Sequence, residues 1–222
     1  MTQHLKIDFV SDVSCPWCAI GLYALKQAVA NLGDQVAVDL HFQPFELNPN
    51  MPPEGQDITE HIVQKYGSSP QQLAQTRETI RVRGAELGFT FDVGLRGRIY
   101  NTFDAHRLLH WAALEGRQLE LKQALFKAYF TDGKNPSDHE VLASAASEAG
   151  LDAARAAAIL ANGEYADEVR AQEEFYQDNG IHAVPAVIVN DTHLIQGGQP
   201  VAAFEQALRR IAAQVRPANV SA

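Results

Sequence analysis

This sequence of 222 residues has only two cysteines, few basic residues and no long apolar run. Its 18 lysines and arginines against 27 acidic residues give a formal net charge of −9 at pH 7, which argues against nucleic acid or an anionic membrane as a partner. No apolar stretch approaches the ~20 residues that a helix needs to cross a bilayer. Residues 1–6 also lack the features of a secretory signal peptide, so we expect a cytoplasmic protein that does not act at a membrane.

The shortage of cysteine limits what the two thiols can do. A structural zinc site usually takes four Cys or His ligands, often from paired C-x-x-C motifs, and no second pair exists here. A structural disulfide is typical of small secreted scaffolds, which this chain does not resemble. His106 and His110 are spaced by one helical turn but lack the glutamate and the third ligand of a metal centre, so we predict no metal site. Two inert buried thiols remain an alternative to a redox pair.

The two cysteines form the motif Cys15-Pro16-Trp17-Cys18, which follows a strand pattern and opens a helix pattern. This is the layout of a thiol–disulfide active site. The first thiol lies at the N-terminus of the helix, where free N–H groups and the helix dipole favour its thiolate. The second thiol can attack a mixed disulfide that forms on the first. The motif therefore favours redox chemistry.

The pattern along the chain predicts an α/β protein with a long insertion. The outer parts have the order strand–helix–strand and strand–strand–helix; the expected elements are residues 5–10, 17–32, 36–42, 186–189, 193–196 and 200–215. Helical signals dominate between them, and Ser137 with Glu140 forms a capping box for one of these helices. We therefore predict a discontinuous domain, residues 1–48 with 180–222, and an inserted all-helical domain over residues 49–179.

Pro185 precedes the first returning strand and admits two interpretations. A trans proline is tolerated at the first residue of a strand. A cis Val184–Pro185 bond would instead leave the backbone of Val184 free to pair with an extended substrate. The local sequence leaves both alternatives open.

Several segments together resemble the DsbA-like thioredoxin superfamily, and its FrnE-like branch in particular. They are residues 15–18 with Gly21, and residues 44–49, 101–108, 184–186 and 197–200. The resemblance implies a thioredoxin fold with a helical domain inserted between its β-α-β and β-β-α halves, which agrees with the pattern above. It also implies that Cys15 is the nucleophile, that Cys18 is the resolving thiol and that Pro185 is a cis proline facing them.

The third motif position predicts the direction of the reaction. Many secreted relatives have a histidine there, whereas this chain has Trp17, which supplies no positive charge. We therefore expect a couple less oxidising than the roughly −120 mV of DsbA. A reductase or disulfide isomerase acting on protein or peptide disulfides is favoured. No tightly bound cofactor is needed, and glutathione or another dithiol would be the redox co-substrate.

The remaining candidate residues belong to a substrate groove or to a proton path. An apolar groove is expected from Pro16, Trp17, Phe45, Val184 and Pro185, with His182 at its border. Phe45 fits the core equally well, and His182 fits a solvated loop.

Four polar residues are candidates for a proton relay or for the cleft, namely Glu46, Asn101, Asp104 and His106. Glu46 follows the second strand and, if buried, could accept the proton of Cys18; a surface or capping role is the alternative. The other three lie in a segment that matches the family, so one of them is expected to face the cleft. Helix capping explains Asn101 equally well.

Two further functions stay open. One is a glutathione-dependent isomerase or a kappa-type glutathione transferase acting on a small aromatic substrate. Such proteins share the helical insertion but typically lack a C-x-x-C motif, so both cysteines argue against this function. The other is a redox-coupled holdase that binds unfolded chains. The sequence leaves the physiological substrate, the redox partner and the oligomeric state open.

Overall fold

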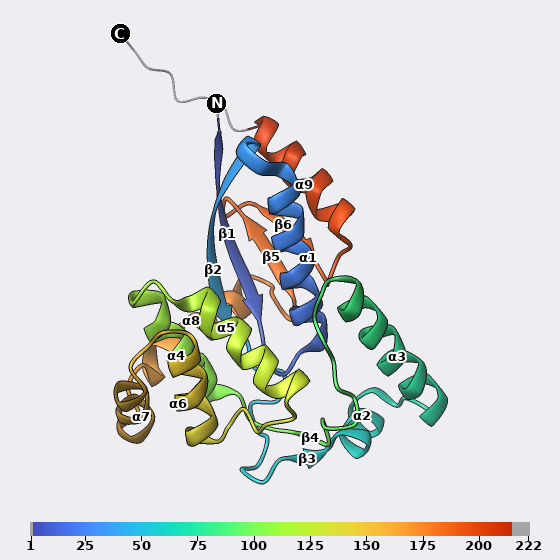
Figure 1. Cartoon of the computed structure of the whole chain (residues 1–222), viewed down its shortest axis with the longest axis vertical. Coiled ribbons are helices and arrows are strands. Elements are labelled where there is room, and N and C mark those ends of the chain that lie inside the picture. Colours follow the sequence, from blue (N-terminus) through green and yellow to red (C-terminus); the bar gives the residue numbers. More distant parts are fainter. Residues whose placement is uncertain (1, 215–222) are drawn as a thin grey trace.

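A four-stranded sheet forms the centre of the computed structural model, which describes residues 2–214. Its strand order is β2-β1-β5-β6, from β1 (Gln3–Ser11), β2 (Val36–Pro44), β5 (Ala186–Val189) and β6 (His193–Gln196). β1 and β2 are parallel, whereas β5 is antiparallel to both β1 and β6. The first and last parts of the chain therefore share one sheet (Figure 1).

β1 is buried on both faces because helices cover the sheet from both sides. Successive residues of a strand point to opposite faces. Ile7 and Phe9 belong to one apolar cluster with α1 (Pro16–Leu32) and α9 (Val201–Gln214). Val10 belongs to another cluster with Tyr176 of α8 (Ala166–Asp178). The sheet therefore forms the middle layer, and the mixed α/β thioredoxin fold predicted from the sequence is confirmed.

The insertion contains nearly all the remaining helices and lies around the end of the sheet to which β1 points (Figure 1). Its elements are β3 (Gln56–Asp57), α2 (Ile58–Tyr66), α3 (Pro70–Glu86), β4 (Arg98–Ile99), α4 (Phe103–Leu114), α5 (Gln118–Phe126), the π-helical turn η2 (Lys127–Thr131), α6 (His139–Glu148), α7 (Ala153–Asn162) and α8. The two-residue strands β3 and β4 pair antiparallel, a feature that the helical pattern did not predict. Two residues are too few for a period-two pattern to be recognised.

Two apolar clusters show how the insertion is attached. Helices α4 to α7 share a cluster to which Val13, just after β1, contributes. In contrast, Phe89, Phe91 and Phe130 join the same cluster as the sheet and α1. The division into two domains, with residues 49–179 as the inserted one, stays a proposal.

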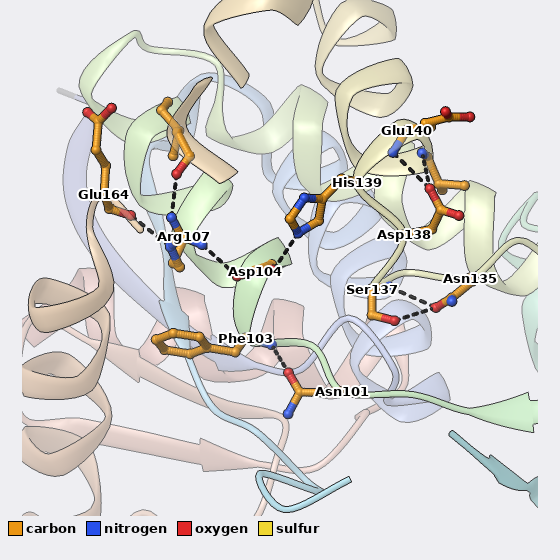
Figure 2. Close-up of polar contacts among 12 residues, drawn as sticks. Asn101, Phe103, Asp104, Arg107, Asn135, Ser137, Asp138, His139, Glu140 and Glu164 are labelled. Carbon is orange, nitrogen blue, oxygen red and sulfur yellow. Dashed lines mark hydrogen bonds and ion pairs between the residues drawn. The ribbon is translucent and has the colours of Figure 1, made fainter. Parts of the chain in front are cut away.

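One predicted helix cap is wrong. Asp138, not Ser137, caps α6: its Oδ1 accepts hydrogen bonds from the N–H groups of Glu140 at 2.8 Å and Val141 at 3.2 Å (Figure 2). The Ser137 hydroxyl instead donates to Oδ1 of Asn135 at 2.8 Å. Asp and Ser are nearly equal as N-caps, so the sequence alone did not distinguish these neighbours.

The ends of the other elements agree closely with the predicted ranges. The main difference is that β1 and β2 extend one or two residues further at their ends than the apolar patterns indicate. The predicted end of the last helix at residue 215 lies outside the described residues. None of the helices within residues 2–214 combines the length and the apolar character that crossing a membrane requires.

Candidate active site

Cys15 occupies the N-cap of α1, directly after the loop that follows β1. Its φ and ψ of −88° and 112° are extended, and its carbonyl accepts hydrogen bonds from the N–H groups of Cys18 at 3.1 Å and Ala19 at 3.3 Å. Pro16 follows at the first helical position, where it loses no hydrogen bond and has a suitable φ. The positive end of the helix dipole therefore lies at Cys15 and favours negative charge there.

The loop before β5 faces this thiol. The Val184–Pro185 peptide is cis, and the carbonyl oxygen of Val184 lies 3.9 Å from Sγ of Cys15, within range of an S–H···O contact. Gly21 on α1 permits this approach, because a Cβ at that position would lie 3.3 Å from Cγ of Pro185. The structure thus brings Cys15, Val184 and Pro185 together, in the arrangement that the resemblance implies.

Trp17 is held in place by the segment between β6 and α9. A Cβ at Gly198 would lie only 2.8 Å from the carbonyl oxygen of Trp17, so the close approach requires glycine. Arg83 of α3 donates to the carbonyl of Gly198 at 2.7 Å, and its guanidinium carbon lies 5.5 Å from the centre of the Trp17 ring. The backbone of Trp17 therefore packs against this segment, and its indole lies beside the Arg83 guanidinium.

A cavity of about 360 Å³ opens above Cys15. Its base is formed by Ser14, Cys15, Pro16, Trp17 and Val184. Most of its wall is apolar and comes from the insertion; the main residues are Ile58, Ile62, Leu73, Ile80, Phe91, Ile99 and Phe130. This volume lies within the range of small-molecule sites. We refer to it below as the substrate cavity.

Arg96 adds a positive charge to the wall of the substrate cavity. Its Nη2 donates to the carbonyl of Ser14 at 3.4 Å, and its guanidinium carbon lies 4.9 Å from the ring centre of Tyr129 and 5.0 Å from that of Phe130. Its Nε is buried and has no hydrogen-bond partner among the described residues. Sequence reasoning missed Arg96, which lies in a loop without a recognisable motif.

Cys18 lies one turn further along α1 and does not line this cavity. It is fully buried, whereas Cys15 is 3% exposed, and both thiols are free. Burial raises the pKa of the Cys18 thiol well above its usual range, and the neighbouring Cys15 adds to the rise; the charge of Lys122 opposes it. Cys18 therefore needs help to become a thiolate.

Asp12 is a buried carboxylate just before the motif. Its Oδ1 accepts from the N–H of Ser14 at 3.0 Å, and its Oδ2 accepts from the N–H of Leu47 at 2.7 Å. Nε2 of His106 lies 3.9 Å from Oδ1. Burial opposes ionisation of Asp12, but His106 and the two N–H groups outweigh it and hold its pKa below the ordinary value. Asp12 thus joins the motif loop to the segment after β2.

Lys122 of α5 is the second buried charge near the motif, and sequence reasoning missed it. Its side chain is fully buried, and its Nζ lies 5.1 Å from the ring centre of Phe126 and 5.8 Å from that of Phe42. Burial lowers its pKa to about 8, although the charges of Cys18, Asp12 and Cys15 oppose this. A signal was present: Lys122 precedes Leu125 and Phe126 by three and four residues, within an apolar helical stripe.

Glu46 is buried, but its partners lie away from the cysteines. It forms an ion pair with Arg170 of α8 and accepts a hydrogen bond from Nδ2 of Asn101 at 3.1 Å. The Arg170 guanidinium stacks on Phe103, with its carbon 3.7 Å from the ring centre. The structure thus places Glu46 and Asn101 in a network that fixes the start of α4.

Asp104 is also engaged elsewhere (Figure 2). It accepts from Nη1 of Arg107 at 2.6 Å and lies 2.8 Å from Nε2 of His139. Arg107 in turn donates to the carbonyls of Glu164 at 2.7 Å and Ile159. Of the three candidates in this segment, only His106 reaches the surroundings of the motif, through Asp12.

The expected groove residues divide into two groups. Trp17, Pro16 and Val184 line the substrate cavity. Phe45 instead packs against the cluster that contains Val10 and Tyr176, and His182 is exposed. These two residues and Pro185 do not line this cavity. Within residues 2–214 no group of three His, Cys, Asp or Glu side chains is placed to hold a metal ion.

A sheet with this strand order, a cis proline and a C-x-x-C motif at the start of a helix defines a protein of the thioredoxin-fold class. The DSBA-like thioredoxin domain matches residues 6–209, and the chain belongs to this family. In the crystal structure of a probable DsbA oxidoreductase, SCO1869 from Streptomyces coelicolor, the related chain is 32% identical with a TM-score of 0.90; the alignment covers 98% of this chain and 94% of that one.

Two other known proteins are similar to this chain. The protein YwbO of Bacillus subtilis is 29% identical over 94% of this chain and 96% of its own length. The cytosolic disulfide reductase DsbM of Pseudomonas aeruginosa, solved with glutathione, is 19% identical with a TM-score of 0.59, over 92% of this chain and 99% of that one. At this identity DsbM shows a common fold.

Proposed function

We propose that this protein is a thiol–disulfide oxidoreductase in which Cys15 attacks a disulfide bound in the substrate cavity. One observation carries the proposal: Cys15 lies at a helix N-terminus and at the base of the cavity, while Cys18 lies behind it, sealed from solvent. The accessible thiol is the one whose thiolate the helix favours. Family membership supports an enzyme of the oxidoreductase or isomerase kind.

The proposed reaction has two exchange steps. The Cys15 thiolate attacks one sulfur of the substrate disulfide, the substrate S–S bond breaks, and the first substrate thiolate leaves and takes up a proton. The Cys18 thiolate then attacks the Cys15 sulfur, which releases the second substrate thiol and forms the Cys15–Cys18 disulfide. The substrate gains two electrons and the enzyme loses two. Two molecules of glutathione, or one dithiol, restore the reduced enzyme and become a disulfide.

The reductase or isomerase direction has two supports. Trp17 supplies no positive charge to the Cys15 thiolate, so the reduced form lacks one source of stabilisation. DsbM, a protein of the same fold, is described as a cytosolic disulfide reductase and was solved with glutathione. We extend both features to this chain as proposals: glutathione as co-substrate, and the cytoplasm as its location.

The size of the substrate cavity and the burial of Cys15 limit which disulfides can react. Since Cys15 is 3% exposed and lies under α2 and α3, the rigid surface of a folded protein does not reach its sulfur. A cavity of about 360 Å³ suits a small disulfide or a flexible peptide segment. We therefore propose small-molecule and peptide disulfides as the preferred substrates, and protein disulfides only where they lie on a flexible segment.

A second candidate is a glutathione-dependent isomerase or transferase acting on a small aromatic substrate. The apolar wall of the cavity and the charge of Arg96 would suit an aromatic acid. In that reaction glutathione supplies the thiol, so the double variant Cys15→Ser/Cys18→Ser would keep its activity. A holdase function also stays a prediction, and it too would survive loss of both thiols.

Trapping the mixed disulfide tests the leading proposal. Reduced wild type and both serine variants are incubated with glutathione disulfide, quenched with acid and weighed by mass spectrometry. We expect the internal disulfide in wild type, one stable glutathione adduct on Cys18→Ser, and no adduct on Cys15→Ser. The two variants control for each other, since each removes one sulfur from the same helical turn.

Turnover measurements complete this test. Glutathione-dependent reduction of a small disulfide should fall to the uncatalysed rate in Cys15→Ser, and insulin should be reduced more slowly than the small disulfide by wild type. Full multi-turnover activity in Cys18→Ser would contradict the two-cysteine reaction. Full activity in the double variant would favour the isomerase or transferase.

A further inference from the structure

An open groove of about 470 Å³ adjoins the substrate cavity, between the motif and the turn that joins α2 to α3. Four residues border both spaces, namely Trp17, Tyr66, Ser68 and Thr76. The groove alone is lined by Gly67, Gln72, Gln75 and Thr79. A molecule bound over Cys15 therefore lies next to this groove. We call it the amide groove.

One face of α3 forms a polar stripe along the amide groove, made of Gln72, Gln75, Thr76 and Thr79. Positions three, four and seven residues apart share a helix face. At 1.5 Å per residue, the stripe is about 10 Å long. None of the charged residues of α3 lines the groove. The stripe offers amides and hydroxyls, and it offers no charge.

The start of α3 sets the direction of the Gln72 amide. The hydroxyl of Ser69, the N-cap, accepts from the N–H of Gln72 at 3.2 Å, and Oε1 of Gln72 accepts from the N–H of Ser69 at 2.8 Å. This capping box uses the oxygen of the amide, so its two N–H groups remain donors for a ligand. At the other end of the stripe, the hydroxyl of Thr79 donates to the carbonyl of Gln75 at 2.9 Å, and its oxygen remains an acceptor.

Two aromatic rings, Trp17 and Tyr66, border the groove opposite these polar groups. Tyr66 is 61% exposed, which is high for a large ring. Aromatic side chains with a polar end are typical of binding surfaces, because one side chain supplies both apolar area and a hydrogen bond. Flat apolar surface beside uncharged donors and acceptors fits a peptide backbone, in which nearly every residue has one donor, one acceptor and no charge.

We propose that the amide groove binds the peptide half of an asymmetric disulfide while the substrate cavity holds its other, apolar half. A disulfide has a substituent on each sulfur, and both substituents need room while Cys15 attacks. The stripe of about 10 Å matches three residues of extended chain at about 3.3 Å each. The inference rests on the proposed function and narrows its substrates to mixed disulfides of a peptide thiol with a small apolar thiol.

The proposed step starts with the Cys15 thiolate, which attacks the sulfur of the peptide half. A bond forms between the Cys15 sulfur and the peptide sulfur, the substrate S–S bond breaks, and the small apolar thiolate leaves and takes a proton from solvent. The peptide stays in the groove on Cys15. Attack by the Cys18 thiolate on the Cys15 sulfur then releases the peptide thiol and forms the internal disulfide.

The test uses two mixed disulfides of thiopyridine, an aromatic thiol whose release is followed by absorbance. One carries mercaptoethanol, and the other carries a capped peptide with one cysteine and a run of alanines on one side. Thiopyridine is the better leaving group in both, so Cys15 attacks the other sulfur. The readout is the rate constant for the peptide disulfide divided by that for the mercaptoethanol disulfide, after correction for the same ratio with free dithiothreitol.

For wild type we expect this corrected ratio to be about ten, since several hydrogen bonds form with the peptide half only. It should rise with the first three alanines and stay constant beyond them. Gln75→Trp, which fills the groove at a position that does not line the substrate cavity, should lower the ratio about tenfold. Gln71→Trp is the matched control, because it makes the same change at an exposed position of α3 that lines neither space. It should keep the wild-type ratio.

Gln72→Glu separates binding from helix capping. Glutamate serves in a capping box as glutamine does, so the melting temperature should stay that of wild type. The variant lacks the two N–H donors, and its ratio should fall about fivefold. If Gln72 acts only in the cap, both the melting temperature and the ratio stay unchanged, and its role in the groove is disproved.

The mercaptoethanol disulfide separates failure of this inference from failure of the proposed function. If wild type releases thiopyridine from it no faster than Cys15→Ser does, the proposed function fails. If release is fast but the corrected ratio of wild type is near one, or Gln75→Trp has the wild-type ratio, the proposed function stands and the amide groove is not a binding site for peptides.

Discussion

Cys15 and Cys18 are one helical turn apart, yet the surroundings of the two thiols, here called the Cys15 side and the Cys18 side, differ in almost every respect. Cys15 has a helix terminus, an apolar cavity and the cis Val184–Pro185 loop beside it. Cys18 is sealed from solvent and has Asp12 and Lys122 near it. The difference teaches that the motif supplies two similar thiols, and that their surroundings assign the attacking and the resolving roles.

The insertion contributes to both sides. Helices α2 and α3 supply much of the wall over Cys15, and α5 supplies the lysine near Cys18. The sheet and its loops supply the thiols, Asp12 and the cis proline. Neither part of the chain builds a complete site alone, so the predictions below address the surroundings as well as the cysteines.

The largest expected effect concerns the Cys15 side as a whole. Because Trp17, the side chain at the third motif position, carries no charge, the reduction potential should lie near or below about −230 mV. This is at least about 100 mV below that of DsbA, equivalent to roughly 5 kcal/mol. Equilibration with glutathione buffers, followed by alkylation and mass spectrometry, measures it. A value near −120 mV would mean a strong oxidant, and the reductase or isomerase direction would be abandoned.

On the Cys18 side, Asp12→Asn should lower the free energy of unfolding at pH 7 by about 2 kcal/mol, because a charged acceptor of two backbone N–H groups is lost. The depressed pKa of Asp12 gives the sign of the pH dependence. Its contribution is present above the unfolded pKa and is lost as pH falls through the lower folded pKa. The stability difference between wild type and variant should therefore shrink below about pH 4.

Urea unfolding of both proteins between neutral and acidic pH measures this difference. Asp34→Asn is the control, since Asp34 is exposed in the short turn after α1. It should unfold like wild type at each pH. If the difference in unfolding free energy between wild type and Asp12→Asn stays constant on acidification, the charge of Asp12 does not contribute to stability.

A smaller effect on activity is expected when the substrate cavity is filled while Cys15 itself is left unchanged. Thr76 is an exposed residue of α3 that lines the substrate cavity. Thr76→Trp should lower kcat/KM for a small disulfide about tenfold, equivalent to about 1.4 kcal/mol, by filling that space. Steady-state reduction with glutathione measures the change.

The matched control is Gln71→Trp, an exposed position on the same helix that lines neither the substrate cavity nor the amide groove. It should keep the wild-type kcat/KM. Equal activity of Thr76→Trp and wild type would mean that substrates reach Cys15 by another path, and the preference for small disulfides would be withdrawn.

The order of elements and the ends of the motif helix could be predicted from the sequence because their signals are local. Helix α1, Pro16–Leu32, agrees with the predicted range of residues 17–32 to within one residue. The paired strands β3 and β4 escaped prediction because each has only two residues. Ser137 and Asp138 are adjacent residues with similar capping ability, so only the folded backbone distinguishes them.

The candidate site was only partly predictable. Residues named by the motif and by the resemblance, such as Cys15 and Pro185, lie together as implied. Asp104 lies with Arg107 and His139, and Phe45 packs in the core, because a family segment does not tell which of its side chains turns inward.

The sequence by itself determined the two thiols, their spacing, the helix that begins between them and the α/β order of the chain. These depend on neighbours within a few residues, and local propensity suffices to predict them. Only the tertiary structure decided that Lys122 is buried near Cys18, that Arg96 lines the cavity over Cys15 and that Glu46 pairs with Arg170. The hydrogen bond from Arg96 to Ser14 and the ion pair of Arg170 with Glu46 join residues 82 and 124 positions apart. The energies of buried charges depend on what surrounds them after folding, which no local pattern encodes.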